Sequence, residues 1–209
     1  MFSICITHRV NEDISWVENL YADLVIYNKG DEWDLPYKHR AAPKIKSEVD
    51  TYIRGIIDVY DTLPNYRWVF LLRPDCEKHF PDITRHLSAS QYINLPDDQL
   101  CILSQASFNY NFKEHLEIIK NTPNSEIEMR VYEMLVNILK NLRVSINDNT
   151  FLCGENSQFV VPVGLILSKP KEWWILLHSY ILRLDDMFGE NLSHIFKILW
   201  SPIFVNGSM

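Results

Sequence analysis

The chain has 209 residues, of which 47% are hydrophobic and 22% charged, and its formal net charge at pH 7 is -7. This length suffices for one large hydrophobic core and is short for two independent ones. We therefore expect a single domain over residues 1–205 and a flexible tail at 206–209. An acidic chain without a long run of lysines and arginines is unsuited to binding phosphate backbones, which excludes nucleic acid as an expected partner.

The N-terminus lacks the basic flank and the long apolar region of a signal peptide. The longest apolar stretch, at 159–167, is about half as long as a membrane span requires. The four cysteines, at positions 5, 76, 101 and 153, show no metal-binding spacing and no dense disulfide framework. These features predict a cytoplasmic protein with reduced cysteines and no membrane span.

The first third of the chain alternates predicted strands and helices. Buried strands are predicted at 2–7, 24–27 and 66–73, with a helix starting near Asn11 and another over 47–60. Residues 31–46 are predicted to form a loop. This order favours parallel strands joined by right-handed crossovers, so that the ends of all three strands lie along one edge. The expected fold class is α/β, with a mostly parallel central sheet flanked by helices.

The rest of the chain is less regular. We expect a mixed segment over 97–112, a helix over 126–142, and two strands around a polar turn at 154–158. Two further helices are predicted, one from Pro170 and one over 190–200.

Two carboxylates follow the third predicted strand directly, in the order Asp75-Cys76-Glu77. Ligands bind at the carboxyl edge of open α/β sheets, and acidic groups one residue apart on a turn can share a cation. The alternative is an ordinary strand-to-helix turn in which Asp75 caps the helix. With parallel strands, Arg9, Asn11, Asn28 and Asp75 would meet in one crevice suited to a nucleoside diphosphate held through a divalent cation.

Common catalytic motifs do not occur: there is no GxxxxGK[ST], no GxGxxG after a strand, no GxSxG and no HExxH. The segment THRVNEDISWVENL resembles the first strand and helix of inverting GT-A-type glycosyltransferases, with His8 in place of the usual proline. More of the chain resembles a family of uncharacterised glycosyltransferase-like domains found in fungi, bacteria and large DNA viruses. The matching segments are NEDISW, YNKG, YIRGIIDVYDTLPN, DCEKH, SQFVVP, KPKEWW and LWSPIF.

The resemblance implies a GT-A-like fold and metal-assisted transfer of a sugar from a nucleoside-diphosphate sugar to a carbohydrate or glycan acceptor, viral glycosylation included. Asp75 and Glu77 would bind Mn²⁺ or Mg²⁺. The residues implied to line the nucleotide-sugar site are Thr7, Arg9, Asn11, Asn28, Arg73 and Asp75. The segment before the second helix departs from the family pattern and keeps only Glu48, although Lys44 and Lys46 could still supply positive charge.

An inverting transferase needs a carboxylate base to take the proton of the acceptor hydroxyl. Glu155, in the polar turn before a strand, is the candidate, and Asp185 and Asp186 at the end of a helix are its rivals. Each could instead be a solvated surface residue.

Each of four further side chains allows two interpretations of its role. Trp173 and Trp174 could stack on a sugar or pack in the core. His79 and His194 could reach the metal or have a structural role.

Two other functions remain open from the sequence. The fold could be a catalytically inactive module that binds carbohydrate or nucleotide. The same acidic pair could also serve a metal-dependent phosphohydrolase.

Overall fold

The computed structural model describes residues 3–8, 12–19, 23–29, 38–41, 47–79, 96–103, 107–123, 125–145, 150–154 and 157–205. The strands are β1 (Ser3–His8), β2 (Asp23–Asn28), β3 (His39–Ala41), β4 (Trp68–Leu72), β5 (Cys101–Ile102), β6 (Ser107–Asn111), β7 (Thr150–Gly154) and β8 (Phe159–Pro162). The α-helices are α1 (Val49–Val59), α2 (Cys76–His79), α4 (Phe112–Asn121), α5 (Glu126–Asn141), α6 (Val163–Leu167), α7 (Lys171–Phe188) and α8 (Glu190–Val205). Two 3-10 helices, η1 (Ser15–Asn19) and η2 (Tyr60–Asn65), also lie among the described residues.

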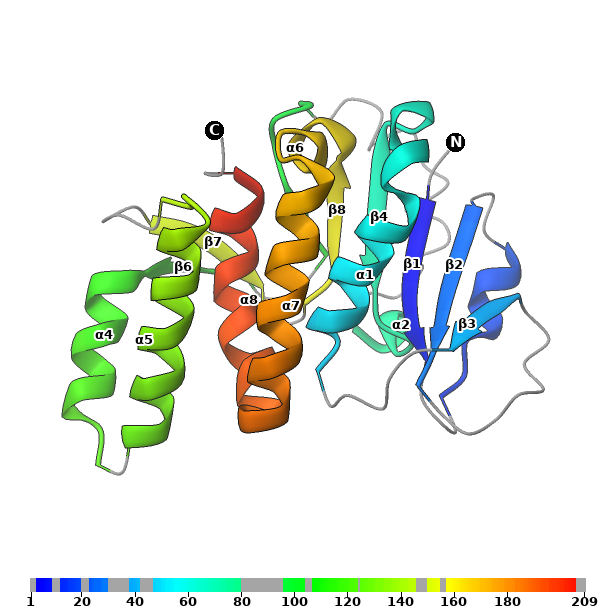
Figure 1. Cartoon of the computed structure of the whole chain (residues 1–209). Helices are drawn as coiled ribbons and strands as arrows, with labels where there is room; N and C mark the ends of the chain where they lie inside the picture. The colour runs from blue at the N-terminus through cyan, green and yellow to red at the C-terminus, as the bar shows by residue number, and fades with distance from the viewer. Residues whose placement is uncertain are drawn as a thin grey trace.

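The main sheet has six strands in the order β3-β2-β1-β4-β8-β5 (Figure 1). Strands β1, β2, β3 and β4 are mutually parallel, and β8 runs antiparallel to both of its neighbours, β4 and β5. Strands β6 and β7 form a separate antiparallel pair, beside α4 and α5 in Figure 1. The sheet is therefore mixed, with its parallel part at the N-terminal end of the chain.

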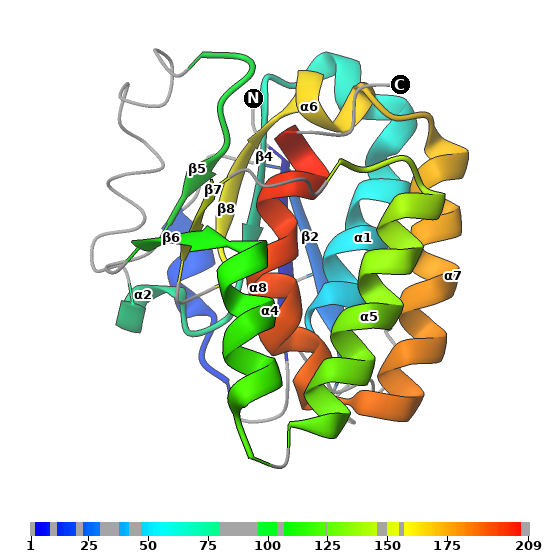
Figure 2. The ribbon, with the colours of Figure 1, turned by 90° about the vertical axis from the view of Figure 1, so that its left-hand side faces the viewer.

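Strand β4 is buried along its whole length because both faces of the sheet are covered. Val69 and Leu71 belong to a large core cluster that includes α1, α7 and α8. Trp68, Phe70 and Leu72 belong to a smaller cluster on the opposite face with Trp16 and Val17 of η1. Figure 2 accordingly shows α1, α5 and α7 on one side of the sheet and the blue η1 segment on the other. The alternation follows from the period of two residues in a strand.

The α/β class predicted from the sequence is confirmed, and so are the parallel pairings of the first three predicted strands. The mostly parallel sheet is corrected: among the described residues, three strand pairings are parallel and three are antiparallel. The sequence could not reveal this, because a short buried strand has the same apolar composition in either direction.

Several elements were not predicted. Strand β3 lies in the predicted loop 31–46, and helices α4 and α6 were missed. Helix α8 continues past its predicted end at residue 200 to Val205, although it contains Pro202. The last turns are buried, so packing of Ile203 and Phe204 outweighs the loss of one backbone hydrogen bond at the proline.

The interpretation of Trp173 and Trp174 as a sugar-stacking surface is wrong. Their side chains are buried, and the two rings pack edge to face with centroids 5.0 Å apart. Each indole Nε1 donates a hydrogen bond to a backbone carbonyl, of Leu142 and Ile166 respectively. They belong to the core.

A buried group of charges joins β2, α1 and α7. The fully buried Asp50 is hydrogen-bonded to His178 (Oδ1 to Nε2, 2.6 Å), and its Oδ2 lies 3.9 Å from Nζ of Lys29. Lys29 also donates to the backbone oxygen of Ser47. The Ser47 hydroxyl accepts from the amide of Val49, 3.0 Å away, so Ser47 satisfies an amide at the start of α1.

A second buried cation, Lys169, lies between α6 and α7. Its Nζ is 5.4 Å from the centroid of the Trp173 ring and 6.0 Å from that of Trp174. The rings supply a partial counter-charge, but burial still lowers the pKa of Lys169 from 10.5 to about 8.

We expect Asp50→Asn to lower the free energy of unfolding by about 3 kcal/mol, because it removes the negative charge that faces the buried Lys29 ammonium. Adding Lys29→Met should recover part of this loss. Urea denaturation measures both effects. Lys120→Gln, which breaks the exposed pair with Glu117, is the control and should change stability by less than about 0.5 kcal/mol. An Asp50→Asn protein as stable as wild type would contradict the structural role of the carboxylate.

We expect Lys169→Met to change the pH dependence of stability. The folded pKa of Lys169 lies below the unfolded one, so the unfolded state binds more protons between pH 8 and pH 10.5, and wild-type stability gains up to about 3 kcal/mol across that window. Burial raises the pKa of Cys153 to about 12, which has the opposite effect, but equally in both proteins. The unfolding free energy of Lys169→Met minus that of wild type should therefore fall as pH rises from 7.5 to 10. A difference independent of pH would refute this.

Candidate functional site

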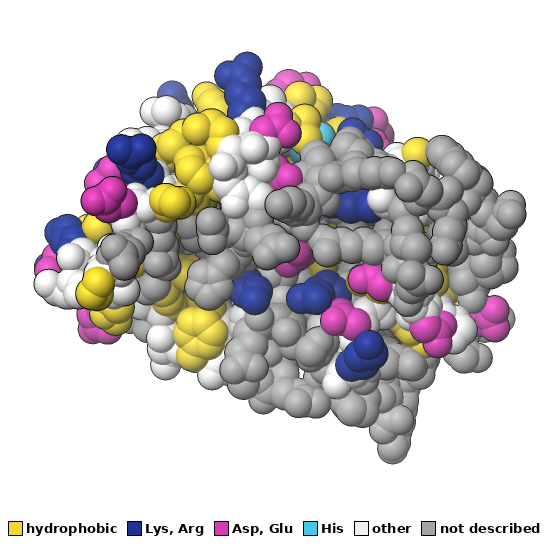
Figure 3. Space-filling view, turned by 90° about the horizontal axis from the view of Figure 1, so that it is seen from below, with side chains coloured by type: hydrophobic (Ala, Val, Ile, Leu, Met, Phe, Trp, Pro, Cys, Tyr) yellow, Lys and Arg dark blue, Asp and Glu magenta, His cyan; other side chains and the backbone are white. Residues whose placement is uncertain are grey.

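The carboxyl ends of β1, β2 and β4 lie along one edge of the sheet, as the sequence predicts. His8 at the end of β1 is in register with Asn28 at the end of β2, and Thr7 with Tyr27. On the other side of β1, Ile6 is in register with Leu72, the last residue of β4. Figure 3 looks onto this lower edge, where basic and acidic side chains lie close together. The backbones of Thr7, Asn28 and Arg73 are thus brought to one edge.

This edge contains the point at which the chain reverses its direction of travel across the sheet. From β1 the chain moves outward to β2 and β3, then returns past β1 to β4. The first crossover carries η1 on one face and the second carries α1 on the other. Between β1 and β4 the connecting segments therefore leave toward opposite faces of the sheet, and open α/β sheets bind their ligands in a crevice outside such a point.

Asp75 lies in the turn that directly follows β4, beside this crevice. Its carboxylate forms an ion pair with the guanidinium of Arg73, with Nε 3.1 Å from Oδ1 and Nη2 3.2 Å from Oδ2. The indole Nε1 of Trp16 donates to the backbone oxygen of Pro74 at 3.0 Å, which fixes the turn from the η1 side. Both side chains of the ion pair remain partly exposed, at 32% for Arg73 and 24% for Asp75.

Ser157 and Gln158, immediately before β8, support the same turn and were not identified from the sequence. The Gln158 Oε1 accepts from the backbone amide of Arg73 at 3.4 Å, and the Ser157 backbone oxygen accepts from the hydroxyl of Tyr52 at 2.8 Å. Both residues are fully buried, yet Ser157 Oγ and Gln158 Nε2 find no hydrogen-bond partner within the part of the chain that the structure describes. Buried polar atoms without partners are rare and call for an explanation, such as a water molecule or a ligand. Only the segment SQFVVP pointed to this turn.

The end of β2 is polar and buried. Asn28 is 4% exposed, which suits a residue that borders a binding crevice or anchors a turn. The neighbouring Lys29 turns inward to Ser47 and Asp50, so it does not supply charge to the crevice.

The rival bases differ in their surroundings. Asp185 is buried and its Oδ1 accepts from the backbone amide of Ser47 at 3.2 Å, which ties the end of α7 to the start of α1. Asp186 is exposed. Glu48, which the family pattern retains, accepts from the hydroxyl of Ser193 at 3.1 Å.

Several predicted site residues lie outside the described residues. These are Arg9, Asn11, Lys44, Lys46 and Glu155, together with the side chains of Thr7, Glu77, His79 and His194. Their roles stay predictions.

The donor set can be tested for its fit to a divalent cation. Within the described part of the chain, no three acidic, histidine or cysteine side chains gather in a way that could hold a metal ion. Asp75 offers a hard carboxylate oxygen of the kind that Mn²⁺ and Mg²⁺ prefer, and Glu77 follows within the same turn of α2. A cation there would compete with Arg73 for Asp75.

None of the described helices has both the length and the apolar character needed to cross a membrane.

Comparison with known proteins gives one result. No curated protein and no solved structure matches the chain. A family model matches residues 4–209, nearly the whole length, and its description is "Protein of unknown function (DUF3431)". The chain therefore belongs to the DUF3431 family.

Proposed function

We propose that the protein is a GT-A-like glycosyltransferase, which transfers a sugar from a nucleoside-diphosphate sugar to a carbohydrate acceptor with the help of a divalent cation. The observation that carries the proposal is the position of Asp75 at the carboxyl end of β4, beside the crevice between β1 and β4. The resemblance of several segments to glycosyltransferase-like domains gives the chemistry, and the topology gives a place for it.

The other side of the crevice supports nucleotide binding. Asn28 ends β2, on the same carboxyl edge of the sheet as the turn that carries Asp75, and an amide can pair with the edge of a base. The orphaned Ser157 Oγ and Gln158 Nε2 add two unsatisfied polar atoms behind the same turn. A polar ligand or water in the crevice would satisfy them.

Asp75 and Glu77 would hold Mn²⁺ or Mg²⁺, which neutralises charge on the departing diphosphate. Arg73, released from Asp75, would add a further positive charge next to the diphosphate.

Glu155 is the proposed base for the acceptor hydroxyl. It stands two residues before Ser157, whose backbone is held by Tyr52 near the carboxyl edge of the sheet.

A catalytically inactive nucleotide-binding module is the second candidate. The bidentate contact of Arg73 with Asp75 favours it, since a carboxylate satisfied by an arginine is a poorer metal ligand. The two functions differ in their need for metal and turnover.

A thermal-shift panel of nucleoside diphosphates and their sugars, with and without Mn²⁺, tests the proposal. A ligand at 100 times its Kd stabilises the native state by about 2.7 kcal/mol, so we expect uridine or guanosine diphosphate with Mn²⁺ to raise Tm by about 5 °C or more. Asp75→Asn should abolish this shift, while the exposed control Asp98→Asn should retain it. Stabilisation that needs no metal and survives Asp75→Asn would favour the binding module. No response to any member of the panel would refute both.

Glu155→Gln tests the base. General-base catalysis contributes about 10²–10⁴-fold, so Mn²⁺-dependent hydrolysis of the donor sugar should fall within that range. The nucleotide-dependent Tm shift should persist, because Glu155 is not proposed to bind the nucleotide. Asp186→Asn, at an exposed rival carboxylate, is the matched control and should leave hydrolysis unchanged. If Asp186→Asn lowers hydrolysis and Glu155→Gln does not, the assignment of the base is wrong.

A further inference from the structure

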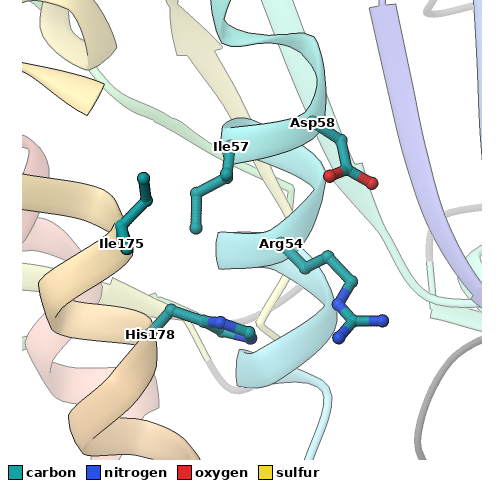
Figure 4. A pocket seen from close by; sticks show the side chains of 5 residues that line it. All are labelled: Arg54, Ile57, Asp58, Ile175 and His178. Atoms are coloured by element: carbon teal, nitrogen blue, oxygen red, sulfur yellow. The ribbon is translucent and has the colours of Figure 1, made fainter. Parts of the chain in front are cut away.

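A pocket of about 290 Å³ lies between α1 and α7, on the helical face of the molecule and apart from the strand-edge crevice. It is lined by Arg54, Ile57 and Asp58 of α1 and by Ile175 and His178 of α7. In Figure 4 the two isoleucines lie between the helices, and the imidazole ring of His178 reaches from α7 toward α1. The pocket thus combines an apolar wall with charged groups.

The two acidic groups near the pocket are already engaged. Asp58 accepts a hydrogen bond from the hydroxyl of Tyr27 at 2.6 Å and forms an ion pair with Arg40. Asp50, behind the pocket, is fully buried and engages His178 through Oδ1. Neither carboxylate depends on Arg54 for a counter-charge.

Arg54 is half-buried, and among the described residues it has no hydrogen-bond or ion-pair partner. Its guanidinium presents a planar set of donors that matches a carboxylate. The contact of His178 Nε2 with Asp50 orients the imidazole and leaves Nδ1 as the ring nitrogen available to a ligand. Two nitrogen groups thus line a pocket whose negative charges are neutralised within the protein.

We propose that this pocket binds a small organic carboxylate with a short branched aliphatic body. Arg54 binds the carboxylate, His178 contributes a second polar contact, and Ile57 and Ile175 contact the aliphatic body. The aliphatic walls distinguish this ligand from inorganic phosphate, which has no apolar surface to bury. The inference does not depend on the proposed glycosyltransferase activity, because none of the pocket residues belongs to the strand-edge site.

Titration of the full chain with isobutyrate, acetate and inorganic phosphate, followed by two-dimensional NMR, tests the proposal. Isobutyrate should shift the resonances of α1 and α7 and of the His178 ring, and bind at least about threefold more tightly than acetate, since each buried methyl or methylene group contributes about 0.8 kcal/mol. Arg54→Gln should weaken isobutyrate binding by about tenfold or more. Arg183→Gln, on the exposed part of α7, is the control and should bind as wild type does.

Thermal melts without ligand establish that both variants are folded. The titration repeated on Asp75→Asn should be unchanged, which separates this site from the proposed nucleotide site. The proposal is overturned if isobutyrate produces no shifts in α1 and α7, if Arg54→Gln binds it as tightly as wild type, or if phosphate binds as tightly as isobutyrate.

Discussion

The architecture depends on the carboxylate of Asp50, which is fully buried at the start of α1 between a lysine and a histidine side chain from other elements. A carboxylate removed from water is tolerated only when partners compensate for its lost hydration. Lys29 brings the end of β2 to it, and His178 brings the middle of α7. Since α1 is the crossover that returns the chain from β2 and β3 to β4, this contact also fixes α1 against the parallel part of the sheet, whose carboxyl edge carries the candidate site.

The second support of the crevice comes from β8. Because β8 is antiparallel to β4, the turn before it lies at the carboxyl end of β4, where Gln158 meets the amide of Arg73. A parallel strand in this position would have placed its preceding turn at the opposite edge. The antiparallel direction, which the sequence did not predict, therefore brings Ser157 and Gln158 to the candidate site.

The sequence predicted those features that depend on local pattern. The buried strand β4 was predicted from a run of neighbouring apolar residues, and the strand-helix-strand order made parallel pairing of β1, β2 and β4 the expected result. Asp75 was found because it directly follows a buried strand.

What the sequence missed depends on distant contacts. Strand β3 has only three residues and no apolar alternation, so it is defined by pairing with β2. The position of Lys29 beside Gly30 is typical of an exposed turn. Lys29 is nevertheless buried, because it contacts Ser47 and Asp50, which lie 18 and 21 residues further along the chain. Trp173 and Trp174 have the spacing of a helical face, and only the packing of α7 decides that this face is internal.

The Arg73 side chain bears on both proposed functions of the candidate site, glycosyl transfer and nucleotide binding. While Arg73 is paired with Asp75, the two charges largely cancel. Neither a metal ion nor a diphosphate then meets an uncompensated opposite charge at this strand edge. Because both side chains are partly exposed, the ion pair can be exchanged for other contacts without leaving a buried charge uncompensated. A divalent cation bound together with a diphosphate would give both side chains new contacts. Asp75 would contact the cation, and Arg73 would contact the phosphate oxygens. Either ligand alone would break the ion pair and replace the contact of only one of its two members, which favours joint binding of metal and nucleotide over binding of either one.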